Sequence, residues 1–142
     1  MNVVVARFES YAETVPEALD ACGAGPVMAA ARRIVLKPNL VDSKPHPVTT
    51  PPQCVEAALD YCRRVAPGAE VVIAEGSGQV DSLPVFQALG YADLARRRGV
   101  EIVDLNQAPL TRLHDPQNKY MPEFYCPTLL LDCVLVTIPV LK

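Results

Sequence analysis

Short apolar runs without alternation recur along the chain, and each is followed closely by a polar residue or a turn. Such runs are typical of strands in a parallel sheet that is covered on both faces. The pattern predicts strands at residues 3–6, 33–36, 71–75, 100–105 and 134–138. The clearest is 71–75, because its apolar residues lead directly to Glu75 and a Gly-Ser-Gly turn.

Helical periodicity fills most of the segments between these strands. It is clearest at residues 50–66, where Thr50 and Gln53 fit a capping box and apolar residues then repeat at the helical interval. Further helices are expected at 15–22, after a capping box formed by Thr14 and Glu17, between Ser82 and Gly90, and at 92–98. A weak hairpin pattern covers 110–114 and 124–126, and 128–132 predicts a helical turn.

Strands that alternate with helices require right-handed crossovers and a mostly parallel sheet. The sequence therefore predicts an α/β fold with a mostly parallel sheet of about five strands and helices on both faces, a three-layer sandwich. The 142 residues suffice for a single α/β domain spanning 1–142.

Composition and charge narrow the class of protein. Half of the residues are hydrophobic and the net charge is −3, with no long basic run, which argues against nucleic-acid binding. The longest apolar stretch, 129–141, is interrupted by Asp132 and is shorter than the about 20 residues of a membrane span. We expect a cytoplasmic protein that binds neither nucleic acid nor membrane.

The cysteines and histidines fit no familiar site. The five cysteines, at 22, 54, 62, 126 and 133, contain no C-x-x-C and indicate neither a disulfide framework nor a metal cluster. His46 and His114 are the only imidazoles, and no Ser-His-Asp set can be assembled around them. No metal site is predicted, and no cofactor is identified.

Polar side chains follow several predicted strands at the point where each strand ends. The carboxyl ends of parallel strands share one edge of a sheet, where ligands bind in open α/β folds. Polar residues also end strands simply because strands run into solvent, and for any single residue that explanation is preferred. For Lys37 and Glu75 together we favour function, because apolar strands deliver both into turns that contain proline or glycine.

The turn Gly76-Ser77-Gly78 offers backbone amides that suit a phosphate or carboxylate. It is not a dinucleotide fingerprint, since Asp81 occupies the place of the last glycine, and no G-K-[ST] follows to make a Walker loop. Taken alone, an ordinary turn is the preferred interpretation.

Five ordered motifs carry a resemblance to a known family. They are Ile34-Val35-Leu36-Lys37-Pro38-Asn39-Leu40-Val41 with Thr49-Thr50-Pro51-Pro52, Val72-Ile73-Ala74-Glu75-Gly76-Ser77-Gly78, Phe86-Gln87-Ala88-Leu89-Gly90-Tyr91, Val103-Asp104-Leu105-Asn106 and Ile138-Pro139-Val140-Leu141-Lys142. Together they resemble the domain-of-unknown-function family 362 over nearly the whole chain.

The resemblance implies a mostly uncharacterised family, many of whose members resemble iron–sulfur proteins through an attached or neighbouring cluster domain. The family pattern proceeds past Lys142, so this chain is expected to be a fragment that carries only the N-terminal part.

The main functional hypothesis is a site for a small anionic or metal-chelated ligand at the carboxyl edge of the sheet. Lys37 would orient or polarise the anionic group, and Glu75 would be the general base or a metal-binding carboxylate. The remaining predicted ligand-binding residues are Asn39, Thr50, Gly76, Ser77, Gly78, Asp104, Asn106 and Lys142. Lys37→Met is expected to abolish binding and to leave the melting temperature almost unchanged.

Two alternatives stay open. In the first, residues 74–78 and Asp104 form an S-adenosylmethionine site of a transferase, although this strand is third rather than first in the chain. In the second, the chain is a non-catalytic accessory domain that forms a homodimer or docks a redox partner through an exposed last strand.

Overall fold

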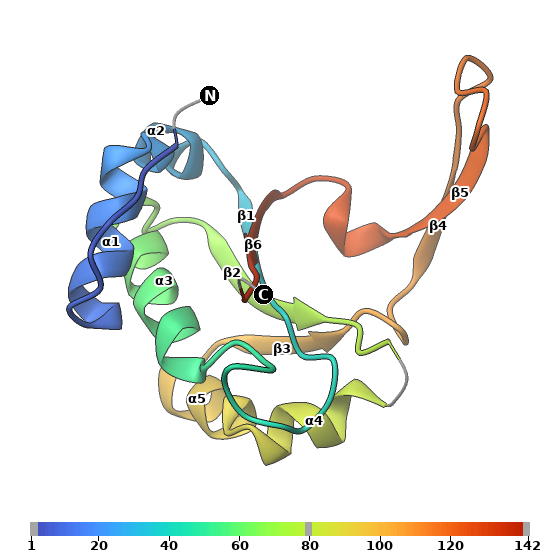
Figure 1. Ribbon diagram of the computed structural model, residues 1–142. Coiled ribbons are helices and arrows are strands. Elements are labelled where there is room, and N and C mark those ends of the chain that lie inside the picture. The colour runs from blue at the N-terminus through green and yellow to red at the C-terminus, as the bar shows by residue number, and fades with distance from the viewer. Residues whose placement is uncertain (1–2, 79–80, 141–142) are drawn as a thin grey trace.

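The computed structural model describes residues 3–78 and 81–140. Its strands are β1 (Arg33–Pro38), β2 (Glu70–Glu75), β3 (Glu101–Asp104), β4 (Leu110–His114), β5 (Glu123–Pro127) and β6 (Val134–Ile138). Its helices are α1 (Tyr11–Ala21), α2 (Ala24–Ala29), α3 (Pro52–Val65), α4 (Ser82–Ala88), α5 (Tyr91–Arg98) and the 3-10 helix η1 (Thr128–Leu130). Figure 1 shows their arrangement.

Within these residues the chain forms a four-stranded sheet in the order β3-β2-β1-β6 and a separate antiparallel hairpin, β4-β5. All the pairs of the larger sheet are parallel. The middle residues of β1 and β2, Ile34 to Leu36 and Val72 to Ala74, are fully buried, as their uninterrupted apolar runs predict. The predicted α/β class, the mostly parallel sheet and the hairpin are confirmed.

The strand expected at residues 3–6 does not form. Residues 3–8 have no regular structure, and Val3 and Val5 are 88% and 94% exposed. A short apolar run becomes a strand only where a neighbouring strand supplies hydrogen bonds and packing. This run finds no such neighbour among the described residues, so the parallel sheet there has four strands instead of about five.

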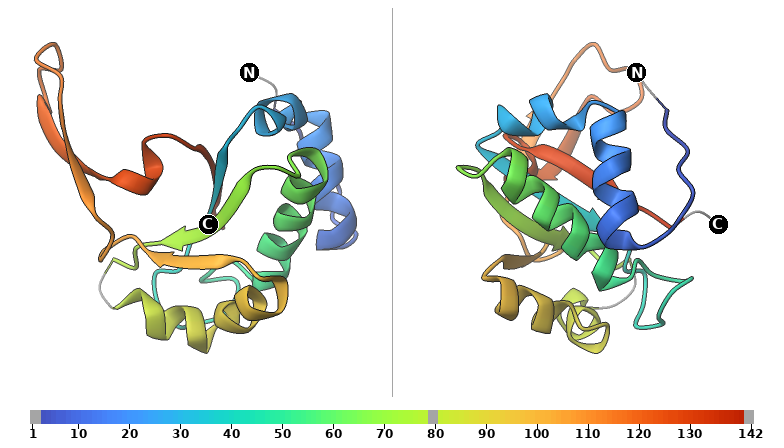
Figure 2. Two further views of the ribbon diagram at one scale, coloured as in Figure 1. Left: turned by 180° about the vertical axis from the view of Figure 1, so that it is seen from behind. Right: turned by 90° about the vertical axis from the view of Figure 1, so that its left-hand side faces the viewer.

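The helices are distributed unequally over the two faces of the sheet. Side chains of α1 to α5 share one core with Ile34, Leu36 and Ile73. On the opposite face, Val35 and Val72 pack against a small cluster to which η1 contributes. The sequence predicted helices on this face as well, but there the structure has only the 3-10 helix η1 among the described residues. Most of the chain between β3 and β6 forms the protruding hairpin instead (Figure 2).

Two predicted helix starts are corrected by the hydrogen bonds. The first helix is capped by Ser10, whose hydroxyl accepts from the Glu13 amide and donates to the Glu13 carboxylate at 2.9 Å, so it begins four residues before Val15. Helix α3 lies where the periodicity predicts, but its N-cap is Pro51 and no side chain caps it. The hydroxyl of Thr50 is used elsewhere. No helix in the described ranges combines the length and apolar character that a membrane span requires.

Helix α1 is fastened to α3 by a polar contact at the edge of the core. The buried Tyr61 donates from its hydroxyl to Asp20 at 2.7 Å, and Arg64 contacts the other carboxylate oxygen at 3.0 Å. The bond from Tyr61, followed by that from Arg64, lowers the pKa of Asp20. Burial, followed by the same hydrogen bond, raises the pKa of Tyr61 to about 12. This contact lies far from the carboxyl edge and is structural.

Candidate functional site

The two central strands separate at their carboxyl ends. The pairing of β1 with β2 ends at Leu36 and Ile73, whereas β1 continues beside β6 to Pro38 and β2 continues beside β3 to Glu75. Each strand thus stays paired with its outer neighbour, and β1 and β2 are no longer paired at the edge where open α/β sheets bind ligands.

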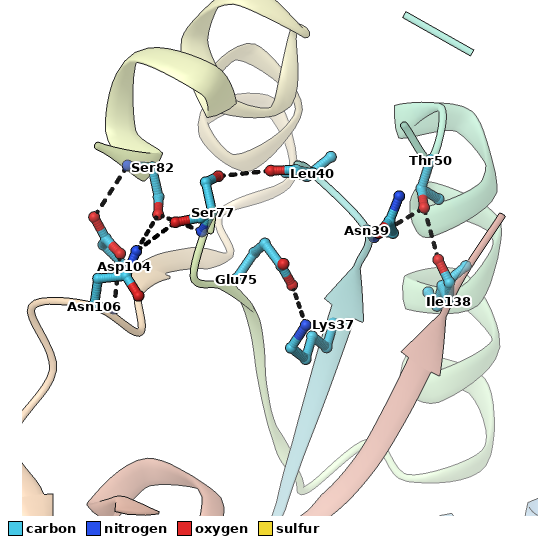
Figure 3. A network of polar contacts seen from close by, with 10 residues as sticks. All are labelled: Lys37, Asn39, Leu40, Thr50, Glu75, Ser77, Ser82, Asp104, Asn106 and Ile138. Atoms are coloured by element: carbon cyan, nitrogen blue, oxygen red, sulfur yellow. Dashed lines mark hydrogen bonds and ion pairs between the residues drawn. The ribbon is translucent and has the colours of Figure 1, made fainter. Parts of the chain in front are cut away.

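Lys37 and Glu75 meet just beyond this last pairing of β1 with β2. The Lys37 Nζ lies 2.5 Å from Oε2 of Glu75, and Figure 3 shows the two side chains pointing toward one another between the strand ends. The Glu75 side chain is 7% exposed and that of Lys37 is 33% exposed. The sequence placed both residues at one edge, and the structure brings them into direct contact. Their catalytic roles stay predictions.

The polar groups of Ser77 all form hydrogen bonds within the protein. Its hydroxyl donates to the Leu40 carbonyl at 2.6 Å, and its amide donates to the Ser82 hydroxyl at 3.0 Å. Its carbonyl accepts from the Asn106 side chain at 2.9 Å. The side chain that was expected to hold ligand oxygens therefore bonds to the loop after β1, and the Ser77 backbone joins the same turn to Ser82 and Asn106.

Asp104, at the end of β3, also bonds within the protein. One carboxylate oxygen accepts from the backbone amide of Ser82 at 3.3 Å, and the other accepts from the backbone amide of Asn106 at 2.9 Å. Asp104 is buried, and its two bonds join the start of α4 to the end of β3. Asp104 and Asn106 lie beside Ser77 and Ser82, to one side of the Lys37–Glu75 pair (Figure 3).

Asn39 and Thr50 close the loop that follows β1. The backbone amide of Asn39 donates to the Thr50 hydroxyl at 3.0 Å, and that hydroxyl donates to the Ile138 carbonyl at 2.6 Å. The Thr50 amide returns a bond to the Asn39 carbonyl at 3.0 Å. These bonds clamp the base of the loop to the end of β6, which is why Thr50 does not cap α3.

Sequence reasoning missed Tyr91 and placed Ser82 only at the start of a predicted helix, whose N-cap in the structure is Asp81. The fully buried Tyr91 donates to the Thr50 carbonyl at 2.8 Å. Burial raises the pKa of Tyr91, with smaller contributions from the Cys54 thiol and the Glu75 carboxylate. The available signal was its position directly after Gly90, at the end of one of the five motifs.

The two glycines of the turn differ in their surroundings. A Cβ at Gly76 would lie 2.7 Å from Oδ1 of Asn106, whereas a Cβ at Gly78 would meet nothing within 4 Å. Gly76 is therefore required by close packing, and Gly78 faces open space. Lys142, the remaining predicted ligand-binding residue, lies outside the described residues.

The site is an open contact at the sheet edge. Surface cavities of about 590, 410 and 330 Å³ lie between α1 and α3, beside Thr50, and at the amino ends of β1 and β6. Lys37 and Glu75 line none of these three. A ligand at the pair would thus approach Lys37 from solvent.

The cysteines are free thiols, and Cys54 and Cys62 lie on α3 as expected. Burial raises the pKa of the Cys62 thiol to about 11 and also raises that of Cys54. No group of three or more His, Cys, Asp or Glu side chains in residues 3–78 and 81–140 is arranged to hold a metal ion.

The parallel sheet and its polar carboxyl edge define an α/β protein of the kind that carries its sites beyond the strand ends. Residues 34–142 match the family described as Domain of unknown function (DUF362), and the chain belongs to this family. The match begins within β1, so α1 and α2 precede the matched region. No curated protein and no solved structure matches the chain.

The burial of Glu75 changes the expected effect of Lys37→Met. Removing one partner of a buried ion pair leaves an uncompensated charge, which costs about 3–5 kcal/mol when the pair is fully buried. Because Lys37 is 33% exposed, we predict a loss nearer about 2–3 kcal/mol in the free energy of unfolding for Lys37→Met. The double variant with Glu75→Gln should recover much of this loss in urea denaturation.

The control is the ion pair between Arg33 and Glu70 at the amino ends of the same two strands, whose side chains are 34% and 50% exposed. The cycle of Arg33→Met and Glu70→Gln should show a coupling of only about 0–1 kcal/mol. Equal couplings in the two cycles would contradict a special role for the buried carboxylate.

The turn gives a second prediction. Gly76→Ala should destabilise the protein by about 1–3 kcal/mol, because the new methyl group displaces Asn106 from its bond to the Ser77 carbonyl. Gly78→Ala is the matched control and should change stability by less than about 0.5 kcal/mol. Similar thermal unfolding of the two variants would show that Asn106 does not constrain the turn.

Proposed function

We propose that this protein binds a small anionic ligand at Lys37, at the carboxyl edge of the sheet. The observation that carries the proposal is the ion pair of Lys37 with the buried Glu75 beyond the last pairing of β1 with β2, in which the Lys37 side chain stays one-third exposed. An ammonium group at this position is accessible to a carboxylate or phosphate that arrives from solvent.

The surroundings of Lys37 support the proposal because they are held in place. Ser77, Asp104 and Asn106 fix the turn after β2 and the end of β3, and Thr50 fixes the loop after β1. Binding sites work best where fixed neighbouring residues hold the contacting groups in place. Here the ligand would meet Lys37 and Glu75.

If the site is catalytic, Lys37 would polarise the anionic group and Glu75 would act as the general base. A metal-chelated ligand would present its cation to the same carboxylate. Ser77 and Asp104 are not assigned contacts with the ligand, because their polar atoms bond within the protein. The S-adenosylmethionine alternative gains no support for the same reason, since it needs Asp104 for the ribose.

A second candidate function is that of an accessory domain that pairs with a copy of itself or docks a redox partner of the iron–sulfur kind. It is favoured by β6, an edge strand without a charged residue whose Leu135 is 44% exposed, and by the hairpin, where Tyr120 and Tyr125 are 99% and 61% exposed.

Inorganic phosphate tests the main proposal. In protein with ¹³C-labelled lysine, phosphate should shift the Cε resonance that disappears in Lys37→Met, and the titration should saturate. Lys44→Met, which removes a 72% exposed lysine from the neighbouring loop, should bind phosphate as the native protein does. A Lys37 resonance that does not respond, or equal loss in both variants, would refute the proposal.

Light scattering tests the second candidate. A dimer mediated by the apolar edge should dissociate when Leu135→Lys places a charge on the exposed face of β6, with the far-ultraviolet circular dichroism unchanged. A monomer at all protein concentrations would remove self-association and leave only a different partner.

A further inference from the structure

Within residues 3–78 and 81–140, the cation paired with Glu75 is Lys37. The charged and titratable neighbours of Glu75 are Lys37 on β1, Asp104 opposite it on β3, and Tyr91 on α5, whose pKa its charge helps to raise. Asp104 is itself an acid, and the Tyr91 hydroxyl donates to the Thr50 carbonyl. Lys37 is thus the group that neutralises a carboxylate that is 95% buried, since Glu75 is 5% exposed.

A ligand that draws Lys37 away creates a problem at Glu75. An anion such as a simple carboxylate takes the ammonium group but offers nothing to the buried carboxylate that it leaves behind. A buried, unpaired charge is strongly unfavourable. Such an anion can bind well only if Glu75 takes up a proton or if the ligand brings a donor of its own.

From this arrangement we infer that the ligand of the site carries two adjacent groups, an anion for Lys37 and a hydroxyl or ammonium donor for Glu75. A 2-hydroxy acid or a 2-amino acid has this chemistry, because its carboxylate and its donor are on neighbouring carbons. The inference rests on the proposed anion site and deepens it by naming the class of ligand.

The geometry suits such an exchange of partners. Lys37 Nζ and Glu75 Oε2 lie 2.5 Å apart, so two neighbouring groups of one small molecule can reach both after a modest movement of the lysine. Lys37 lies one residue and Glu75 two residues beyond the last pairing of β1 with β2, where the strands no longer hold each other. Gly76, directly after Glu75, adds no side chain.

Propionate, L-lactate and L-alanine test the inference, because they differ only in what the second carbon carries. The readout is again the Lys37 Cε resonance. At neutral pH, lactate or alanine should bind at least about tenfold more tightly than propionate, since propionate leaves Glu75 unpaired.

Glu75→Gln should abolish the discrimination, because a neutral carboxamide needs no cation and can both donate and accept a hydrogen bond. Glu70→Gln, at the amino end of the same strand, should retain it. Circular dichroism verifies that both variants fold, and the comparison within the native protein needs neither of them.

Each outcome separates this inference from the broader proposal. Equal affinities for the three acids, or no response to them while phosphate binds, would overturn the inference and leave an anion site. No response of Lys37 to phosphate or to any of the acids would overturn both.

Discussion

One ion pair joins the two central strands at the point where their hydrogen bonding ends. Beyond Leu36 and Ile73, β1 stays with β6 and β2 stays with β3, so the sheet splits into two halves at its carboxyl edge. Lys37 and Glu75 connect these halves. A parallel sheet cannot avoid bringing its strand ends to one edge, and at this edge an ion pair takes the place of the backbone pairing between β1 and β2.

Separated strands and the loops after them expose backbone groups that still need partners. Here side chains supply them. Ser77 bonds to the Leu40 carbonyl, Asn106 to the Ser77 carbonyl, and Thr50 to the Ile138 carbonyl. No buried side-chain nitrogen or oxygen in the described part of the chain lacks a partner. The polar residues of the edge therefore divide into those that hold loops and the pair, Lys37 and Glu75, that joins two strands.

Sequence could predict the strands that are buried on both faces, because burial of that kind leaves an uninterrupted apolar run, as at residues 71–75. Sequence could not distinguish residues 71–75 from residues 3–6, which are similarly apolar but have no neighbouring strand among the described residues. Hydroxyl side chains were ambiguous for a different reason. Thr50 can cap a helix, bind a ligand or bond a carbonyl, and the partner that decides lies 88 residues away. Only the register of the sheet, which spacing does not reveal, brings Ile138 to it.

The same register makes Lys37 the more exposed member of the pair at this edge. Gly76 must be a glycine because Asn106 lies where its Cβ would be, and Asn106 is held by its bond to Ser77. Glu75 and Ser77 are buried, so neither can swing outward without losing its partners. The Lys37 side chain is long, flexible and one-third exposed, and the contact that it loses on turning away is its ion pair with Glu75. A ligand that binds here would therefore contact a fixed surface that includes Glu75, and Lys37 would be the side chain that adjusts to it. If Lys37 binds an anion as proposed, the conformational cost of binding falls mainly on this side chain.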